Sequence, residues 1–358
     1  MSNLSVDIIR QAIADHPDPE TGRPMDSMGQ IKEVEVTGNE VKVTVGLSSH
    51  SIAIADDVTD AMKSKIIAAA PGCNVAIDVV DHPRPPTRSG QIGLRAKSVI
   101  AVGSGKGGVG KSTVAASIAL TLRRLGSKVG LMDADVYGPS IPHLLGLSGR
   151  PSISEEKRIE PIMHGNMPVM SMGFLVEPDQ AVIWRGPMLH GSINQFLGET
   201  DWGELDYLII DMPPGTGDIA LTLSQALPLA GSVVVCTPQE VALLDAIKAI
   251  SMFNKVNIPV LGMVENMSGF LCPDCGKTYD IFGRGGARKQ AEQRNVPFLG
   301  ELPIDISLRT AGDEGKLADV IDSNPNARAP LEVVAKAMVR SLAAKTSAAP
   351  PKVSLPTL

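Results

Sequence analysis

Residues 105–112 read Gly105-Lys106-Gly107-Gly108-Val109-Gly110-Lys111-Ser112. They fit the pattern G-x-x-x-x-G-K-[ST], in which glycines let the backbone curl until its N–H groups point at one phosphate. An apolar run at residues 99–102 precedes this turn, and a helical pattern at 112–125 follows it. A helix that starts here adds its partial positive charge. The stretch therefore predicts a phosphate-binding turn between a buried strand and a helix.

Polar side chains near this turn are predicted to complete the site. Lys111 is expected to reach the β- and γ-phosphates, and the hydroxyl of Ser112 to bind Mg²⁺. Thr113 can place a second hydroxyl near the α-phosphate. Further along the chain, Asn266 follows an apolar run, and its amide suits the edge of adenine; an ordinary strand-end turn is the alternative. The predicted nucleotide contacts are therefore 105–112, Thr113 and Asn266.

Apolar runs separated by longer helical patterns characterise the chain from about residue 98. The runs do not alternate with polar residues, as is typical of strands buried on both faces. Buried strands that alternate with helices predict an α/β fold with a mostly parallel sheet covered by helices on both faces. The runs lie at residues 99–102, 129–132, 207–210, 233–235 and 260–264.

Acidic residues follow two of these runs. Asp133 and Asp135 come after the run at 129–132, and Asp211 comes after the run at 207–210. Because ligands of open α/β sheets bind at the carboxyl ends of the strands, we expect these acids beside the phosphate-binding turn. Asp211 is predicted to lie near Mg²⁺. Of the other two acids, one would polarise the attacking water and one would hold the water shell of the metal.

The first part of the chain, residues 1–82, reads as a separate small unit. Helical and alternating patterns follow one another in the order α-β-β-α-β, which predicts a small N-terminal α+β domain. A proline-rich segment at 83–97 is predicted to be a linker. Residues 98–345 then form the α/β domain, and 346–358 are expected to be a disordered tail.

The composition excludes several classes of protein. The chain has 358 residues, with 33 Lys and Arg against 39 Asp and Glu, a formal charge of −6 and 3% aromatic residues. A protein that holds nucleic acid by general electrostatics should be basic, and one that stacks bases needs aromatic side chains. The N-terminus has no basic and apolar leader, and no apolar stretch approaches about 18 residues. We therefore expect a cytoplasmic protein that binds neither nucleic acid nor membrane.

The cysteines predict a metal centre that one chain cannot complete. Cys272-Pro273-Asp274-Cys275-Gly276 is a C-x-x-C turn, but zinc or a [4Fe–4S] cluster takes four ligands. Cys236 lies in an apolar run, and Cys73 lies in the small unit. A two-fold dimer would bring Cys272 and Cys275 together with their symmetry mates. A structural zinc that bridges the dimer is the alternative to a cluster.

The second lysine of the phosphate-binding turn, Lys106, resembles a marker of the deviant phosphate-loop ATPases. In that class this lysine crosses a two-fold interface to the partner's nucleotide, which implies a homodimer; a solvated surface lysine is the alternative. The same resemblance favours Asp135 as the acid that polarises the water, with Asp133 as support. The predicted catalytic residues are Lys106, Lys111, Asp135 and Asp211.

Nearly all of residues 1–345 resembles the Mrp/ApbC family of iron–sulfur cluster carrier ATPases. Besides the phosphate-binding turn, the specific stretches are Asp133-Ala134-Asp135-Val136-Tyr137-Gly138-Pro139-Ser140, Trp184-Arg185-Gly186-Pro187, Asp211-Met212-Pro213-Pro214-Gly215-Thr216-Gly217-Asp218 and Cys272-Pro273-Asp274-Cys275. The resemblance implies a P-loop NTPase that binds ATP and Mg²⁺. It also implies a homodimer that holds a labile [4Fe–4S] cluster at its interface, works with cluster scaffold proteins and passes the cluster to apo-proteins.

The small N-terminal unit is similar to the iron–sulfur assembly accessory domain that is often fused to these ATPases. Asp18-Pro19-Glu20 and Ser27-Met28-Gly29 carry this similarity. Members of the accessory family often have a cysteine after the second strand. This chain has Leu47-Ser48-Ser49-His50 in that place.

Two other functions are alternatives at this point. A positional or partitioning ATPase shares the deviant turn and would carry a structural zinc at the C-x-x-C. It usually needs a membrane-seeking C-terminal helix or a basic DNA-binding face. An ATP-driven electron donor that resembles the nitrogenase iron protein would present two separate single cysteines instead of a C-x-x-C.

Overall fold

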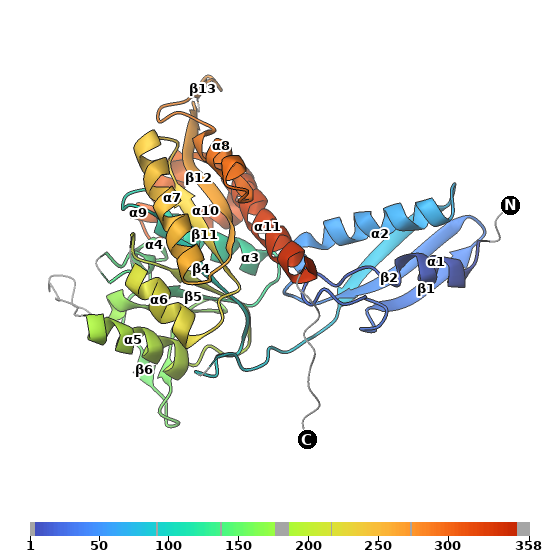
Figure 1. Cartoon of the computed structure of the whole chain (residues 1–358), viewed down its shortest axis with the longest axis horizontal. Helices are drawn as coiled ribbons and strands as arrows, with labels where there is room; N and C mark the ends of the chain where they lie inside the picture. Colours follow the sequence, from blue (N-terminus) through green and yellow to red (C-terminus); the bar gives the residue numbers. More distant parts are fainter. Residues whose placement is uncertain are drawn as a thin grey trace. The chain divides into compact units, whose positions relative to one another are not determined.

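The structure is a computed structural model that describes residues 4–90, 92–136, 138–175, 186–215, 217–272 and 274–348. Its contacts divide the chain into two units. The first comprises residues 1–85 with 339–358, and the second comprises residues 86–338. Figure 1 shows the ribbon with its helices and strands labelled.

The first unit is built on the sheet β1-β2-β3. β1 and β2 pair antiparallel, and β3 lies parallel to β2. α1 and α2 lie against this sheet, because Ile9 and Ile13, one helical turn apart, and Val43 and Val45, on one face of β2, are fully buried. The elements are α1 (Val6–Ile13), β1 (Ile31–Thr37), β2 (Glu40–Leu47), η1 (Ile52–Ile54), α2 (Ala55–Ala69) and β3 (Asn74–Asp81).

The second unit is built on a mostly parallel sheet, in which the described strands have the order β13-β12-β11-β4-β10-β5-β9-β8, with β14 beside β12. β13 and β8 pair antiparallel with their neighbours, and the remaining pairs are parallel. The strands are β4 (Ala96–Gly103), β5 (Val129–Asp133), β8 (Ile162–His164), β9 (Met167–Ser171), β10 (Leu205–Asp211), β11 (Gly231–Cys236), β12 (Val260–Leu271), β13 (Thr278–Tyr279) and β14 (Phe298–Ile304), with β6 (Ser152–Ile153) and β7 (Ile159–Glu160) as a separate ribbon.

Helices cover both faces of this sheet. α3 contacts β4, β5, β10 and β11, while α7 contacts β11 and β12 and lies between α6 and α8. Figure 1 shows α5, α6 and α7 on one side of the strands and α3 on the other. The helices are α3 (Lys111–Arg124), α4 (Ile141–Leu144), η2 (Met172–Phe174), α5 (Gly186–Glu199), α6 (Gly217–Ala226), α7 (Glu240–Lys255), α8 (Gly286–Gln293), α9 (Ile306–Asp313), α10 (Leu317–Ser323) and α11 (Pro325–Ala348).

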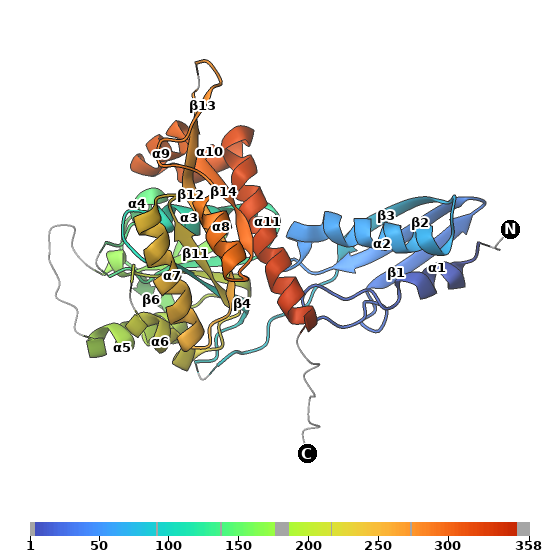
Figure 2. The ribbon, with the colours of Figure 1, turned by 45° about the horizontal axis from the view of Figure 1, so that its top comes forward.

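The predicted fold class is confirmed: a mostly parallel sheet lies between helices, and a small sheet unit precedes it. Three details differ from the sequence expectation. β9 and β14 had not been predicted, because Pro168, Gly300 and Pro303 interrupt their apolar runs. β12 continues well past the run at 260–264, and its hairpin with β13 projects beyond the neighbouring strands (Figure 2).

The end of the chain also differs from the expectation. α11 continues to Ala348, into the segment 346–358 that had been predicted to be a tail, and residues 349–358 lie outside the described residues. Among the described helices, none is both long and apolar enough to cross a membrane.

Candidate functional site

The turn between β4 and α3 holds the predicted phosphate-binding residues. Gly110 is the N-cap of α3 and has a φ of 77°, a left-handed conformation that suits glycine. At Gly105 the constraint is space, because a Cβ there would lie 2.1 Å from the backbone carbonyl of Asp245 in α7. The turn is therefore packed against α7. The first N–H groups of α3 have no partner within the helix and suit a phosphate.

Lys111 lies at the centre of a buried charge cluster. Its ammonium lies 2.5 Å from Oδ1 of Asp211 and 3.6 Å from Oδ2 of Asp135. It also lies 3.2 Å from the hydroxyl of Ser112 and donates to it. Only 6% of the lysine side chain is exposed. The ends of β5 and β10 and the start of α3 thus bring four predicted site residues together.

Asp133 is fully buried and is bonded to the loop that follows it. Its carboxylate accepts from the N–H of Asp135 at 3.0 Å, from the N–H of Ile141 at 3.2 Å and from the hydroxyl of Ser171 at 3.0 Å. Burial, and then the negative charge of Asp211, raise the pKa of the Asp133 carboxyl to about 7. Asp133 therefore shapes the segment that carries Asp135.

Asp211 keeps one carboxylate oxygen for a further partner. Oδ1 pairs with Lys111, whereas Oδ2 is buried and has no hydrogen-bond partner within the described ranges. Burial raises the pKa of this carboxyl, and Lys111 opposes the shift. A buried carboxylate oxygen without a partner, close to the Ser112 hydroxyl, fits a Mg²⁺ ion or one of its waters.

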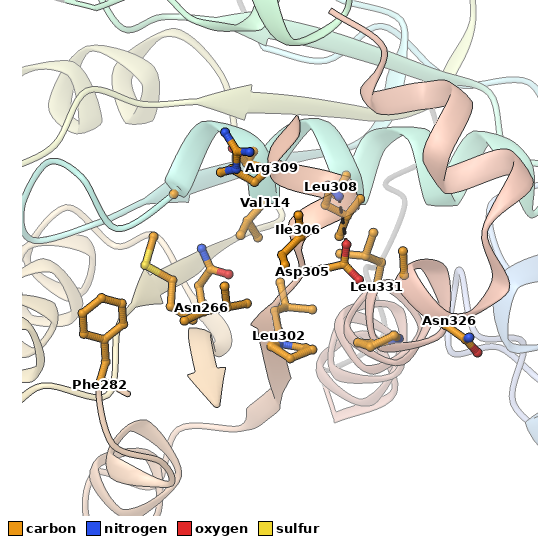
Figure 3. A pocket seen from close by; sticks show the side chains of 18 residues that line it. Val114, Asn266, Phe282, Leu302, Asp305, Ile306, Leu308, Arg309, Asn326 and Leu331 are labelled. Atoms are coloured by element: carbon orange, nitrogen blue, oxygen red, sulfur yellow. Dashed lines mark hydrogen bonds between the residues drawn. The ribbon is translucent and has the colours of Figure 1, made fainter. Parts of the chain in front are cut away.

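A cavity of about 330 Å³ opens beside the phosphate-binding turn. Gly110 and Thr113 line it on the side of the turn, and the apolar side chains of Leu302 and Leu331 are among those that form its other walls (Figure 3). Its volume and apolar lining suit a flat organic ring. The cavity is therefore the candidate site for the base of a nucleotide.

Two polar residues that line this cavity form hydrogen bonds with neighbouring residues of the chain. The carboxylate of Asp305 accepts from the hydroxyl of Ser307 at 2.5 Å and from the N–H of Leu308 at 2.9 Å, as the N-cap of α9. The side-chain amide of Asn266 donates to the carbonyl of Val109 at 2.9 Å. Asn266 thus lies beside the turn, and in this structure its amide nitrogen binds the turn itself; its contact with adenine stays a prediction.

Cys272 and Cys275 lie in the turn of the β12–β13 hairpin. The N–H of Cys272 donates to the carbonyl of Lys277 at 3.0 Å, and the N–H of Gly276 donates to the carbonyl of Cys272 at 2.9 Å. Cys272 is half-buried and Cys275 is exposed. The backbone N–H of Cys275, followed by that of Asp274, lowers the pKa of the Cys272 thiol. The thiolate, which is the form that binds metals, therefore forms at a lower pH than in an ordinary cysteine.

The other two cysteines belong to other elements of the chain. Cys236 is buried in β11, where burial and the charge of Glu265 raise its pKa to about 12. Cys73 belongs to the first unit. In the part of the chain that the structure describes, no group of three or more His, Cys, Asp and Glu side chains could hold a metal ion. The hairpin pair is thus the candidate ligand set, and one chain offers two thiols there.

The surface next to the turn combines a cation with exposed apolar side chains. Lys106 is half-buried, and its ammonium forms no ion pair within the described residues. Val241 and Leu244, on the first turns of α7 and close to Asp245, are 66% and 61% exposed. Apolar side chains exposed near one another indicate an interaction surface.

In the first unit, the Asp18-Pro19-Glu20 stretch binds the start of the predicted linker. Asp18 is fully buried and accepts from the guanidinium of Arg84 at 2.9 Å and from the amide of Gln30 at 2.9 Å. Glu20 lies 3.4 Å from the same guanidinium and accepts from the hydroxyl of Ser48 at 2.5 Å. Ser48, in the segment where the accessory family often has a cysteine, is therefore a buried hydrogen-bond donor.

The motifs also contain residues that lie outside the described ones, namely Tyr137, Trp184, Arg185, Thr216 and Pro273. Sequence reasoning missed the turn between β14 and α9, at 303–306, which forms one wall of the cavity. The sequence contains an indication of this turn, because Pro303-Ile304-Asp305 lies at the carboxyl end of a strand, and ligands bind at the carboxyl ends of the strands in such a sheet. Sequence reasoning also missed Glu265, whose signal is an acid directly after the apolar run at 260–264.

Both units match known protein families. Residues 95–339 match the family model described as NUBPL iron-transfer P-loop NTPase, and residues 7–79 match the one described as iron-sulfur cluster assembly protein. The iron-sulfur cluster carrier protein of Deinococcus radiodurans is 43% identical over 353 residues, which are 98% of this chain and 99% of that protein. The iron-sulfur cluster transfer protein NUBPL of Mus musculus is 50% identical over 231 residues, which are 64% of this chain and 72% of that protein.

Solved structures are similar to the second unit. A nucleotide-binding protein from Archaeoglobus fulgidus, in complex with ADP, is 44% identical with a TM-score of 0.56, over 63% of this chain and 89% of that chain. The cell division ATPase MinD of Pyrococcus furiosus, at 23% identity and a TM-score of 0.50 over 67% of this chain and 97% of that one, shows the fold alone. Because one family model spans residues 95–339 and a carrier protein is similar over 98% of the chain, the protein belongs to the NUBPL family of iron-transfer P-loop NTPases.

Proposed function

We propose that the protein binds and hydrolyses ATP at residues 105–112 and carries an iron–sulfur cluster that two copies of the chain bind through Cys272 and Cys275. The cluster is the cargo, and apo-proteins receive it. One observation carries the proposal. A phosphate-binding turn and a projecting hairpin with two adjacent thiols belong to the same unit.

The charge cluster around Lys111 supports phosphate binding and hydrolysis. Two carboxylates balance its ammonium, which can turn to a β- or γ-phosphate because phosphate oxygens are strong charged acceptors. The Ser112 hydroxyl and Oδ2 of Asp211 would hold Mg²⁺, which neutralises charge on the phosphates when it is bound. Asp135 is 7% exposed and lies beside the ammonium, so it would orient the attacking water.

The cavity supports adenine as the base. Its lining is mostly apolar, as a flat ring requires, and Asn266 lies in it beside the phosphate-binding turn. The amide of Asn266 can donate and accept, which is the combination that the edge of adenine requires.

The surface near the turn supports a homodimer. A second copy would cover the exposed side chains of Val241 and Leu244 and would offer a partner to Lys106. Two copies also supply four thiols, the number that a [4Fe–4S] cluster takes. A cluster held between two exposed hairpin tips is accessible to a receiving protein, whereas a cluster in the core of a domain is not.

Anaerobic reconstitution with iron and sulfide tests this proposal. We expect about four iron and four sulfide for every two chains, as the composition of a [4Fe–4S] cluster requires. Cys272→Ser and Cys275→Ser should lose the cluster. Cys73→Ser is the matched control and should keep it, because Cys73 lies in the other unit. Zinc bound at the hairpin without iron or sulfide would contradict the proposal.

Mixed dimers test whether two chains share the cluster. A tagged wild-type chain is combined with a chain in which both Cys272 and Cys275 are serine. The purified mixed dimer has two hairpin thiols and should hold no cluster, although it should still hydrolyse ATP. A cluster retained by the mixed dimer would show that one chain is sufficient. Transfer is followed by the spectrum of an apo-ferredoxin added to the loaded protein.

A further inference from the structure

Glu265 is a buried carboxylate that the function proposed above does not use. It lies in β12 next to Asn266, and none of its surface is exposed. A carboxylate seldom stays buried unless several donors bind it, because desolvation of a charge is costly. Its donors therefore show what it holds in place.

The two oxygens of Glu265 bind both ends of one excursion of the chain. Oε1 accepts from the hydroxyl of Ser268 at 2.7 Å and from the N–H of Gly285 at 2.7 Å. Oε2 accepts from the N–H of Ala287 at 2.6 Å. Between Ser268 and Gly285 the chain completes β12, turns at Cys272 and Cys275, returns through β13 and reaches α8. A single carboxylate thus closes the root of the cysteine hairpin.

The backbone at this root explains why a carboxylate is needed. Met267 has a φ of 59°, and the pairing of β12 with β14 shifts register between Asn266 and Phe270, so the strand is irregular where the hairpin departs. On the return side, the N-cap of α8 is Gly285, which has no side chain to cap the helix. Glu265 supplies that cap from the neighbouring strand, and the positive end of α8 stabilises its charge.

The same excursion reaches the cavity for the base. Asn266 and Met267 at its departure and Phe282 near its return all line the cavity, and Figure 3 shows Asn266 and Phe282 toward the same end of it. Asn266 also binds the phosphate-binding turn through the carbonyl of Val109. A nucleotide in the cavity therefore meets both ends of the loop whose root Glu265 closes.

We propose that Glu265 is a positioning residue that transmits nucleotide occupancy to the cysteine hairpin. A nucleotide that contacts Asn266 and Phe282 would restrict the motion of both ends of the loop. Because the hydrogen bonds of Glu265 hold these ends together, the restriction extends to Cys272 and Cys275, since closing a loop restricts the residues inside it. The inference rests on the nucleotide binding in the proposed function and does not depend on which cargo the cysteines hold.

Hydrogen exchange of the full-length protein, prepared without iron or zinc and measured with and without Mg-ADP, tests this inference. We expect ADP to slow exchange in the peptide 268–284 of the wild type about ten-fold. In Glu265→Gln, which has one acceptor oxygen and no charge, exchange there should be about ten- to a hundred-fold faster. The hairpin of this variant should also lose its response to ADP, although calorimetry should still detect ADP binding to the protein. Exchange in the peptide 112–124 of α3 should be unchanged without nucleotide.

Two further variants make the test decisive. Glu292→Gln changes an exposed carboxylate at the other end of α8 and should behave as the wild type. Ser268→Ala removes only the bond at the departure of the hairpin and should give a smaller increase in exchange. A wild-type ADP response in Glu265→Gln would overturn the inference.

The remaining outcomes separate the inference from the proposed function. If Glu265→Gln does not fold, Ser268→Ala becomes the test of the inference. Hairpin exchange in Ser268→Ala at the wild-type rate would then overturn the inference. A wild type that binds ADP without any response in the hairpin would also overturn it. A wild type that binds neither ADP nor ATP would instead overturn the proposed nucleotide site.

Discussion

The phosphate-binding turn follows β4 and the cysteine turn follows β12, two parallel strands of one sheet. In the first turn, the Lys111 side chain is 6% exposed and is paired with Asp211 at the end of β10 and Asp135 just after β5. In the second, Cys275 is exposed and the hairpin offers two thiols. One chain thus brings together the charged groups of the first site, whereas it supplies half of the ligands that a cluster takes.

This difference separates two kinds of chemistry. A buried and mutually bonded cluster holds its groups in place for a reaction that benefits from the exclusion of water. Exposed ligands shared between chains suit a cargo that must be gained and released. On our proposal, the occupancy of the cysteine site depends on protein concentration, and the binding of ADP at the phosphate turn of one chain does not.

The largest effect is expected at the complete site. Lys111→Ala removes the cation that balances Asp211 and Asp135, so ATP hydrolysis should fall about 10²- to 10³-fold. Cluster reconstitution without nucleotide should be unchanged. Phosphate release and iron content measure the two sites separately. Lys289→Ala, on the exposed face of α8, is the control. Loss of the cluster in nucleotide-free Lys111→Ala would mean that the two sites are not independent.

A second lysine tests whether the first site is truly complete in one chain. If Lys106 serves the nucleotide of the partner, Lys106→Ala should slow hydrolysis about ten- to a hundred-fold and weaken ATP-dependent association. The affinity of one chain for ADP should hardly change. Phosphate release, sedimentation and calorimetry measure these three quantities. Wild-type hydrolysis in this variant would identify Lys106 as a solvated surface lysine.

The phosphate-binding turn could be predicted from the sequence because its information is local. Gly110, Lys111 and Ser112 are fixed by their spacing in one short stretch. Asp133 and Asp211 could be placed beside it because both end buried strands of a parallel sheet, whose carboxyl ends share one edge. In the structure, Asp133 and Asp211 are register partners at the ends of β5 and β10, and Asp211 contacts Lys111.

Features that depend on distant contacts could not be predicted in this way. The space at Gly105 is limited by the backbone of Asp245 in α7, and no local pattern reveals that approach. Asn266 binds the carbonyl of Val109, which requires the register of β12 against the turn. The role of Glu265 appears only when α8 returns to β12.

Two glycine substitutions extend the comparison to stability. Gly105→Ala would place a Cβ 2.1 Å from a backbone carbonyl of α7, so we expect a loss of about 1–3 kcal/mol in the free energy of unfolding. Gly276→Ala, in the cysteine turn, has a φ of 67° but meets no atom within 4 Å. Its cost should be about 1 kcal/mol, from backbone strain alone. Denaturant unfolding measures both. Equal losses would contradict the contrast between a packed and an open turn.

The smallest effect is a dependence on pH, because the fold shifts pKa values in opposite directions at the two sites. Burial raises the pKa of Asp133 to about 7 from an ordinary value of 3.8, whereas N–H donors lower the pKa of Cys272. Between pH 4 and 7 the folded protein therefore binds more protons at Asp133 than the unfolded chain does. The free energy of unfolding should fall as pH rises through this window, and this fall should level off above pH 7.

Asp133→Asn isolates this contribution, because asparagine keeps one acceptor oxygen and has no charge at any pH. In protein free of nucleotide and magnesium, the free energy of unfolding of the wild type should fall from pH 6 to pH 7 by about 1 kcal/mol more than that of the variant. Alkylation of Cys272 should follow the same pH profile in both proteins, since that thiol lies on the hairpin. Parallel stability curves would show that Asp133 is ionised in the folded protein, with Lys111 balancing its charge as well as that of Asp211.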